Sequence, residues 1–178
     1  MARSNCCTST SRPHPKHDIH RAHFPAGLET VVDIFREYVT SPTVDLGFQD
    51  YAQEFATLPG AYAPPDGCLL LARAGDAVVG CAALRRVDAV CAEMKRVYLR
   101  LAARGTGLGR RLVTAVLAEA HRLGYQRVHL EVLPEFTAAQ ALRRSLGFAP
   151  APPVSFNPVP DTQFLALTLS ARPSPASH

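Results

Sequence analysis

The strongest regular pattern in the chain is an amphipathic helix over residues 107–123, which lies between two short apolar runs. Gly124 follows as a typical C-terminal cap, and the flanking runs at 93–101 and 128–133 have the length and composition of strands. The apolar positions of the helix recur every three to four residues, at Leu108, Leu112, Val116, Ala120 and Leu123. A strand–helix–strand unit is therefore the most constrained part of the expected fold.

The segments on either side extend this unit to an α/β fold. The further elements expected from periodicity and turn residues are strands at 18–22, 68–73, 77–85 and 164–169 and helices at 28–38, 49–58 and 137–146. Three strands in a row followed by a strand–helix–strand unit predict a mixed sheet of six to seven strands with helices on both faces.

The strand expected at 93–101 carries more charged residues than any other strand of the predicted sheet. If it alternates regularly, Glu93, Lys95 and Val97 lie on one side. Met94, Arg96 and Tyr98 then lie on the other side.

The length of 178 residues suits one domain, which we expect at 17–170 between disordered tails at 1–16 and 171–178. No apolar run is long enough to cross a bilayer, and no apolar block follows the first arginines as in a secretory signal. The cytoplasm is therefore the expected compartment. Of the five cysteines, Cys68, Cys81 and Cys91 lie in apolar runs and are expected to be small buried residues. Cys6 and Cys7 are adjacent in a polar segment, and the lack of any C-x-x-C spacing argues against a zinc site made of thiolates.

The formal net charge of +4 is modest and is not gathered into a basic run. This pattern argues against nucleic acid as a partner, and nothing indicates a membrane partner. A small polyanion, such as a phosphate-rich cofactor, fits the charge better.

The turn at 104–111, which reads Arg-Gly-Thr-Gly-Leu-Gly-Arg-Arg, joins the strand at 93–101 to the central helix. Glycines there allow positive φ and let a ligand approach the backbone. Successive N–H groups at a helix N-terminus form a nest for an anion. Arg110 and Arg111 in the first helical turn oppose the helix dipole unless an anion binds nearby.

Two other phosphate-binding motifs fail on spacing. A P-loop requires a Lys after its last glycine, and none follows Gly109. A dinucleotide-binding fingerprint has the spacing G-x-G-x-x-G, whereas Gly105, Gly107 and Gly109 are spaced G-x-G-x-G. An ordinary glycine-rich turn is the alternative that the glycines alone leave open.

The run Arg104-x-x-Gly107-x-Gly109 resembles the [RQ]-x-x-G-x-[GA] signature of the Gcn5-related N-acetyltransferases, the GNAT family. Residues 93–99 resemble the fourth strand of that family. Residues 139–148, which end in Leu-Gly-Phe, resemble its A-x-x-L-Y-x-x-L-G-F helix and turn. The order of elements is similar over roughly 17–170.

The resemblance implies acetyl-coenzyme A as cosubstrate and no metal. Backbone amides of the turn would hold the pyrophosphate, and the strand at 93–101 would run beside the pantetheine arm. That strand and the next would splay apart, with the thioester between them. The residues implied for binding the coenzyme are Val97, Leu99, Arg104, Gly105, Thr106, Gly107, Gly109 and Arg110.

The implied reaction is acetyl transfer to a primary amine, of a small molecule or a peptide, by direct attack. The amine, with a pKa of about 10, must first lose a proton. Glu93 is the first candidate base and Glu131 the second, and the alternative for Glu93 is a paired carboxylate without a catalytic role. An N–H near Val97 or Tyr98 would polarise the thioester carbonyl, so Tyr98 joins Glu93 as a catalytic candidate.

Arg143 stands where the family often has a Tyr that protonates the leaving thiolate. An arginine cannot do so, because its pKa exceeds about 12. It would contact a carboxylate or a phosphate, or lie with Arg144 on a solvated helix face. This departure leaves open a non-catalytic module that binds acyl-coenzyme A. The sequence also leaves open the acceptor, the acyl-chain preference and the formation of a homodimer.

Histidines recur at every third residue near the N-terminus, at His14, His17, His20 and His23. Such spacing could bind a transition metal weakly. Pro13 and Pro15 argue against a helix there, so a disordered, incidental tract is the expectation.

Overall fold

The computed structural model of the chain describes residues 17–43 and 45–170; the tails expected at 1–16 and 171–178, and His14, lie outside these residues. The strands are β1 (His17–Arg21), β2 (Cys68–Ala74), β3 (Ala77–Arg86), β4 (Cys91–Leu99), β5 (Arg127–Val132), β6 (Ala149–Pro150) and β7 (Gln163–Thr168). The helices are α1 (Leu28–Thr40), α2 (Tyr51–Ala56), α3 (Leu108–Arg122) and α4 (Thr137–Ser145).

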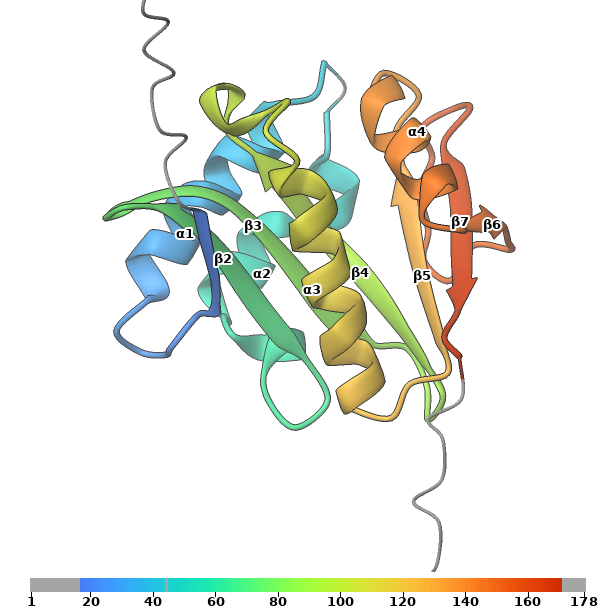
Figure 1. Ribbon diagram of the computed structural model, residues 1–178, viewed down its shortest axis with the longest axis horizontal. Coiled ribbons are helices and arrows are strands. Elements are labelled where there is room, and N and C mark those ends of the chain that lie inside the picture. The colour runs from blue at the N-terminus through green and yellow to red at the C-terminus, as the bar shows by residue number, and fades with distance from the viewer. Residues whose placement is uncertain (1–16, 44, 171–178) are drawn as a thin grey trace, which may run out of the picture.

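The strands form one mixed sheet in the order β1-β2-β3-β4-β5-β7-β6. Helix α3 covers one face, and α1 and α2 cover the other, as Figure 1 shows. Buried residues divide accordingly into two clusters, one built around α3 and one around α1. Because both faces are covered, β2 is a nearly continuous buried apolar run rather than an alternating one. The predicted mixed α/β fold with helices on both faces is confirmed.

The sheet splits between β4 and β5. These two strands pair in parallel only from Cys91 opposite Arg127 to Glu93 opposite His129. Beyond that point β4 continues to Leu99, while β5 pairs along its other edge with β7 over its full length. The splayed sheet that we expected is confirmed, and the two strands diverge toward the end of the molecule that carries the N-terminus of α3 (Figure 1).

Strand β4 does not alternate regularly, and the predicted division of its side chains is wrong. Arg96 has a φ of +56°, and the register against β3 shifts between Cys81 and Ala83. This bulge reverses the alternation. Met94 therefore packs in the cluster around α3, together with Val97, whereas Tyr98 packs against the cluster around α1.

The remaining differences from the expected elements are small. The helix expected at 49–58 is shorter because Asp50, with a φ of +47°, separates a short 3-10 turn at Gly47–Gln49 from α2. Strand β6 was not expected, because a two-residue strand has no periodicity to detect. No helix within the described ranges has both the length and the apolar character needed to cross a membrane.

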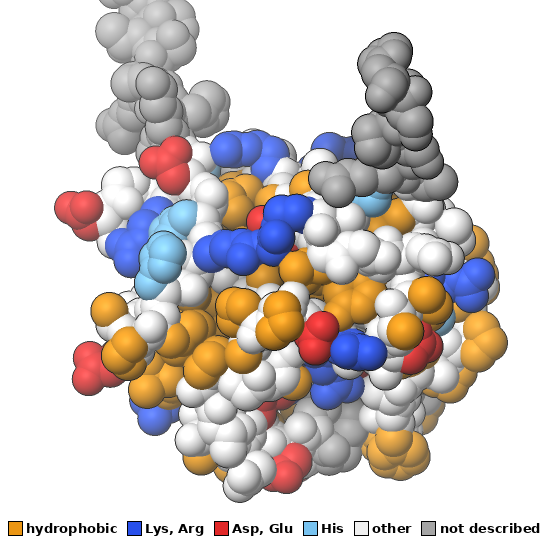
Figure 2. Space-filling model, turned by 90° about the horizontal axis from the view of Figure 1, so that it is seen from below, with side chains coloured by type: hydrophobic (Ala, Val, Ile, Leu, Met, Phe, Trp, Pro, Cys, Tyr) orange, Lys and Arg blue, Asp and Glu red, His pale blue; other side chains and the backbone are white. Residues whose placement is uncertain are grey.

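The surface agrees with the modest net charge of +4. Figure 2 shows one face of the molecule, on which basic, acidic and apolar side chains are interspersed.

Candidate active site

The glycine-rich turn leaves the backbone N–H groups at the N-terminus of α3 accessible. Gly105 and Gly107 have φ values of +75° and +80°, a region that residues with a side chain rarely adopt. The first hydrogen bond at this end of the helix runs from the Arg111 N–H to the Gly107 carbonyl, at 3.2 Å. The N–H groups of Leu108, Gly109 and Arg110 precede it, so they have no partner within the helix. They point out of the helix end, where an anion would bind.

The side chains of this turn stabilise its shape. The Thr106 hydroxyl donates to the Ala103 carbonyl at 2.8 Å. Arg104 Nε donates to the Leu99 carbonyl at 2.9 Å, which joins the turn to the end of β4. Arg110 donates to the Ser145 hydroxyl at 2.6 Å and so connects α3 with α4 across the split. The arginine charges remain beside the helix end, which favours an anion there.

The edge of β4 that faces the split has free backbone positions. The Arg100 N–H donates to Val79 of β3 at 2.9 Å, and hydrogen-bonding direction alternates along an antiparallel strand. The N–H of Tyr98 therefore also points to β3, and that of Leu99 points into the split. We expected a backbone N–H near Val97 or Tyr98 to polarise the thioester carbonyl. The N–H of Val97 is the more consistent donor, because that of Tyr98 faces β3 and not the split. The Tyr98 ring lies edge-on to Tyr38 on the α1 face, at 6.4 Å between centroids.

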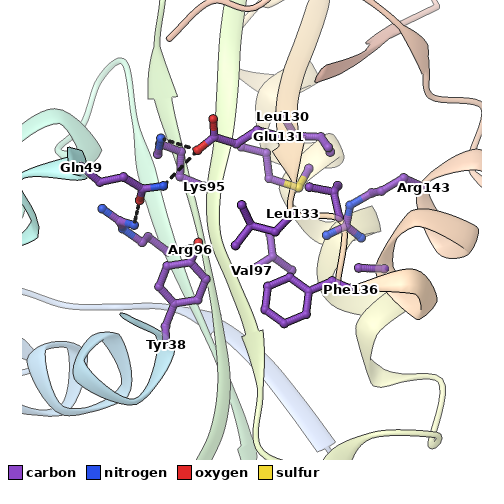
Figure 3. A pocket seen from close by; sticks show the side chains of 13 residues that line it. Tyr38, Gln49, Lys95, Arg96, Val97, Leu130, Glu131, Leu133, Phe136 and Arg143 are labelled. Atoms are coloured by element: carbon purple, nitrogen blue, oxygen red, sulfur yellow. Dashed lines mark hydrogen bonds and ion pairs between the residues drawn. The ribbon is translucent and has the colours of Figure 1, made fainter. Parts of the chain in front are cut away.

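A pocket lies in the split between β4 and β5 (Figure 3). Polar side chains reach it from the α1–α2 side of the sheet, and mostly apolar ones from the α3–α4 side. The residues that line it are Tyr38, Gln49, Met94, Lys95, Arg96, Val97, Leu130, Glu131, Val132, Leu133, Phe136, Ala139 and Arg143. The split therefore holds a pocket that is lined from both sides of the sheet and bordered by charged groups.

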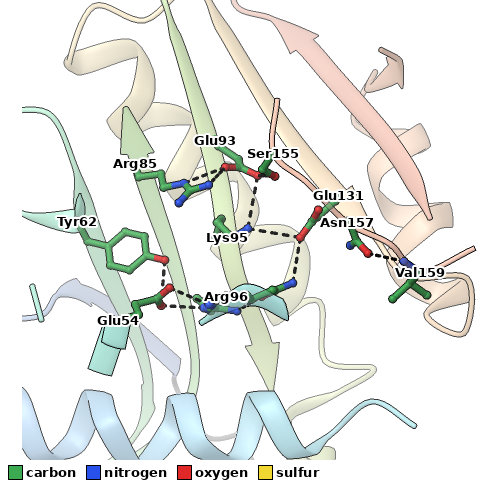
Figure 4. A network of polar contacts seen from close by, with 11 residues as sticks. Glu54, Tyr62, Arg85, Glu93, Lys95, Arg96, Glu131, Ser155, Asn157 and Val159 are labelled. Atoms are coloured by element: carbon green, nitrogen blue, oxygen red, sulfur yellow. Dashed lines mark hydrogen bonds and ion pairs between the residues drawn. The ribbon is translucent and has the colours of Figure 1, made fainter. Parts of the chain in front are cut away.

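Glu93 lies next to the pocket but does not line it. Its carboxylate accepts hydrogen bonds from Arg85 at 2.6 and 2.8 Å and from the Ser155 hydroxyl at 2.8 Å, and Lys95 lies 3.6 Å away (Figure 4). Burial opposes ionisation, but Lys95, Arg85 and these hydrogen bonds outweigh it and lower the pKa of Glu93. These surroundings agree with the paired-carboxylate alternative for Glu93.

Glu131 lines the pocket and keeps one oxygen free. Its Oε1 accepts from Gln49 at 3.1 Å and from Lys95 at 3.4 Å. Its Oε2 is buried and has no hydrogen-bond partner among the described residues. A buried carboxylate oxygen without a donor is costly, and such an atom in a pocket is a candidate proton acceptor.

The bulge in β4 is anchored by a buried ion pair. The Arg96 side chain is completely buried and donates to both oxygens of Glu54, at 2.9 and 2.7 Å (Figure 4). It also donates to the side-chain carbonyl of Gln49, and Tyr62 donates to Glu54 at 3.1 Å. This network ties α2 to β4 and places Gln49 at the pocket. No local pattern reveals this network, because Arg96 is far from its partners in the chain.

A second hollow lies on the α1–α2 side of the sheet. Its lining includes Gln49, Glu54, Thr57, Tyr62 and Arg85. Gln49 belongs to both the hollow and the pocket, so the two meet there.

Arg143 is buried, so the solvated-face alternative for it is wrong. Its exposed fraction is 4 %, whereas the neighbouring Arg144 is exposed. Among the described residues, its Nε and Nη1 have no hydrogen-bond partner, and burial lowers its pKa to about 10. Figure 3 shows the guanidinium directed from α4 into the pocket.

The predicted histidine tract is not brought together with other ligands. Within 17–43 and 45–170, no three His, Cys, Asp or Glu side chains are grouped to hold a metal. His17 and His20 belong to β1, where they pair with β2, so the expected disorder is wrong for these two residues.

A sheet that splits beside a helix N-terminus with a glycine-rich turn defines the class of acyl-coenzyme A N-acyltransferases. Solved structures share this fold: a GNAT-family acetyltransferase of Staphylococcus aureus has a TM-score of 0.72 at 18 % identity, and the match covers 87 % of this chain and 100 % of that one. A putative acetyltransferase of Salmonella typhimurium, solved with its cofactor acetyl-CoA, has a TM-score of 0.61 at 24 % identity over 91 % of this chain and 99 % of that one.

The chain belongs to the acetyltransferase (GNAT) family, whose model matches residues 28–148. An uncharacterized N-acetyltransferase of Schizosaccharomyces pombe is 32 % identical over 154 residues, which cover 85 % of this chain and 94 % of the relative. An IAA acetyltransferase of Azospirillum brasilense is 34 % identical over 105 residues, which cover 58 % of this chain and 69 % of the relative. The protein is therefore an acyltransferase, and the acyl donor of its family is acetyl-coenzyme A.

Proposed function

We propose that the protein transfers an acetyl group from acetyl-coenzyme A to a primary amine by direct attack. The observation that carries this proposal is the pocket through the split sheet, which can receive a donor from one face and an acceptor from the other. The N-acetyltransferase relative supports an amine as the acceptor.

The residues on the donor side fit the coenzyme. The free amides at the N-terminus of α3 can bind the pyrophosphate, and Arg104 and Arg110 add positive charge beside it. The free edge of β4 at Val97 and Leu99 can bond to an extended chain as an added strand would. A pantetheine arm that follows this edge from Leu99 must end before Glu93, because β5 pairs with β4 at Glu93.

The acceptor side is the hollow that meets the pocket at Gln49. Its polar lining supports an acceptor with hydrogen-bonding groups, and the Pro-rich segment near Ser155 borders the same network. A nucleophile that passes Gln49 reaches the pocket beside Glu131.

We assign the base to Glu131 rather than Glu93. Glu131 lines the pocket with a free oxygen, whereas the oxygens of Glu93 are occupied by Arg85 and Ser155. In this assignment Glu131 accepts the proton of the amine, directly or through water, as the nitrogen attacks the thioester carbon. The Val97 N–H donates to the carbonyl oxygen, where negative charge develops.

Direct attack is supported by the state of the cysteines. Burial raises the pKa of Cys68 to about 11 and that of Cys81 further, so neither is a ready thiolate. Cys68, Cys81 and Cys91, the cysteines within the described residues, do not line the pocket. An acetyl-cysteine intermediate has no support from these positions.

The test compares Glu131→Gln with Glu93→Gln in steady-state acetyl transfer to a panel of primary amines. We expect Glu131→Gln to lower kcat by about 100-fold or more and to remove the acidic limb of the pH–rate profile. Loss of that limb in Glu93→Gln but not in Glu131→Gln would instead identify Glu93 as the base. No turnover with any amine by the wild-type protein would contradict the proposed function.

Glu93→Gln should alter stability in acid rather than the pH–rate profile. Folding lowers the pKa of Glu93 from about 4.5, so its ionised form stabilises the fold above that pH. This contribution is lost as the pH falls through the lowered pKa. Urea unfolding between neutral pH and pH 3 or so should show a weaker loss of stability in the variant than in the wild type.

A further inference from the structure

Arg143 is a buried cation for which the protein supplies no anion. The other two cations of the pocket lining have carboxylates: Lys95 lies 3.4 Å from Glu131, and Arg96 lies 2.7 Å from Glu54. Arg143 forms no ion pair with any described residue, and two of its nitrogens are buried without a hydrogen-bond acceptor. Leaving a buried charge unpaired costs several kcal/mol, which indicates that an anion binds there during function.

The position of Arg143 narrows the choice of anion. It projects from α4 beside Phe136 and Ala139, on the side of the pocket opposite Gln49 and Tyr38 (Figure 3). The hollow proposed for the acceptor opens on the Gln49 side. An acceptor carboxylate would have to cross the split to reach Arg143, whereas an arm bound along Val97 passes directly between β4 and α4.

Resting on the proposed function, we propose that Arg143 binds the sulfur of coenzyme A as it departs as a thiolate. In that step the amine nitrogen forms a bond to the carbonyl carbon and the carbon–sulfur bond breaks. The electron pair of the broken bond leaves on sulfur, and the proton of the nitrogen passes to Glu131. Arg143 donates hydrogen bonds to the thiolate without giving up a proton, and solvent protonates the sulfur after release.

The chemistry of the guanidinium fits this role. A pKa of about 10 leaves Arg143 positively charged at neutral pH, so it is a donor and not an acid. A cation beside a thiol lowers the pKa of that thiol, and a low pKa makes sulfur a better leaving group. The apolar neighbours Val97, Leu133 and Phe136 exclude water and strengthen this attraction.

The test measures the pKa of the coenzyme A thiol when it is bound to the full chain, from the ultraviolet absorbance of the thiolate during a pH titration. The variants are Arg143→Met, which removes the charge at similar volume, and Arg143→Lys, which keeps it. Arg144→Met is the matched control, because Arg144 is exposed and its side chain donates one weak hydrogen bond among the described residues, to Gln163 at 3.5 Å.

We expect the bound thiol in the wild type to titrate at least about one unit below the thiol of free coenzyme A measured in the same titration. Arg143→Met should return it to that value and lower kcat about tenfold or more, with little change in the KM for acetyl-coenzyme A. Arg143→Lys and Arg144→Met should keep the lowered thiol pKa. The Arg143→Met protein without ligand should unfold at the same or a higher temperature, because an unpaired buried charge is gone.

An equal thiol pKa in wild type and Arg143→Met, with coenzyme A bound to both, would overturn this inference and leave the proposed function intact. A KM effect of Arg143→Met confined to acidic acceptors would also overturn it, in favour of a carboxylate site. Failure of the wild type to bind coenzyme A at all would overturn the proposed function itself.

Discussion

Arg96 combines the most unusual backbone of the site with its most deeply buried charge. A φ of +56° costs a residue with a side chain about 1–2 kcal/mol. Glu54 compensates with two hydrogen bonds, and Gln49 supplies a third acceptor. One residue thereby creates the bulge in β4, turns Val97 to the α3 side and holds α2 and Gln49 against the pocket.

Removing the partner of Arg96 should destabilise the protein strongly. We expect Glu54→Ala to lower the free energy of unfolding by about 3–5 kcal/mol, because the guanidinium would stay buried without an anion. Urea unfolding measures this loss. Asp33→Ala is the control, since Asp33 forms an exposed pair with Arg36 that is worth about 1 kcal/mol or less. Similar losses in the two variants would show that Arg96 is rehydrated and does not depend on Glu54.

The sequence could suggest which residue types carry the chemistry but not their partners. Glu93 and Glu131 were both candidates for the base, and the surroundings on which we base the proposal of Glu131 are visible only in the folded arrangement. Arg85, Lys95 and Ser155 surround Glu93 from three segments, whereas Glu131 keeps a free oxygen. The burial of Arg143 was equally hidden, because two adjacent arginines on a helix look alike until the opposing strands are known.

At the scale of elements, the turn before α3 depends on backbone shape more than on side chains. A Cβ added at Gly107 would meet nothing within 4 Å, so the requirement there is the φ of +80° and not space. A Cβ at Gly109 would lie 3.5 Å from Leu99 and 3.6 Å from Leu142, which is ordinary contact. The two glycines of the motif therefore have different roles.

Alanine substitutions should separate these roles. We expect Gly107→Ala to lower the free energy of unfolding by about 1–2 kcal/mol, because alanine is strained in the left-handed region. Gly109→Ala should leave stability unchanged or raise it by about 0.5–1 kcal/mol, because position 109 is helical. Urea unfolding of both variants tests this. A larger loss for Gly109→Ala would mean that the positive φ at Gly107 is not what shapes the turn.

Most elements could be predicted because their patterns are local. Helix α3 shows its full period in the sequence, and its bounds differ by one residue at each end from those expected. Strand β4 is the exception, because alternation in a sequence cannot reveal an inserted residue. Glu93 and Arg96 are charged and yet buried, because helices cover both faces of the sheet.

At the scale of the molecule, the split sheet joins two units. Strands β1 to β4 form one, and β5, β7 and β6 form the other, with three paired positions between β4 and β5. The apolar cluster around α3 and the bond between Arg110 and Ser145 hold the units together. The order of elements predicted the mixed sheet, but the point where β4 and β5 separate depends on pairing over long distances in the chain.

The most direct test of acetyl-coenzyme A binding at the split is thermal unfolding of the wild-type protein with and without this ligand, beside NADH and ATP as controls. At 100 times its Kd, a ligand that binds only the folded state adds about 2.7 kcal/mol of stability. We predict a rise in the unfolding temperature with acetyl-coenzyme A that NADH and ATP do not match. An equal shift with all three ligands, or no shift in a well-folded protein, would contradict the assignment of the turn at 104–111 and the pocket beyond it to the acetyl donor.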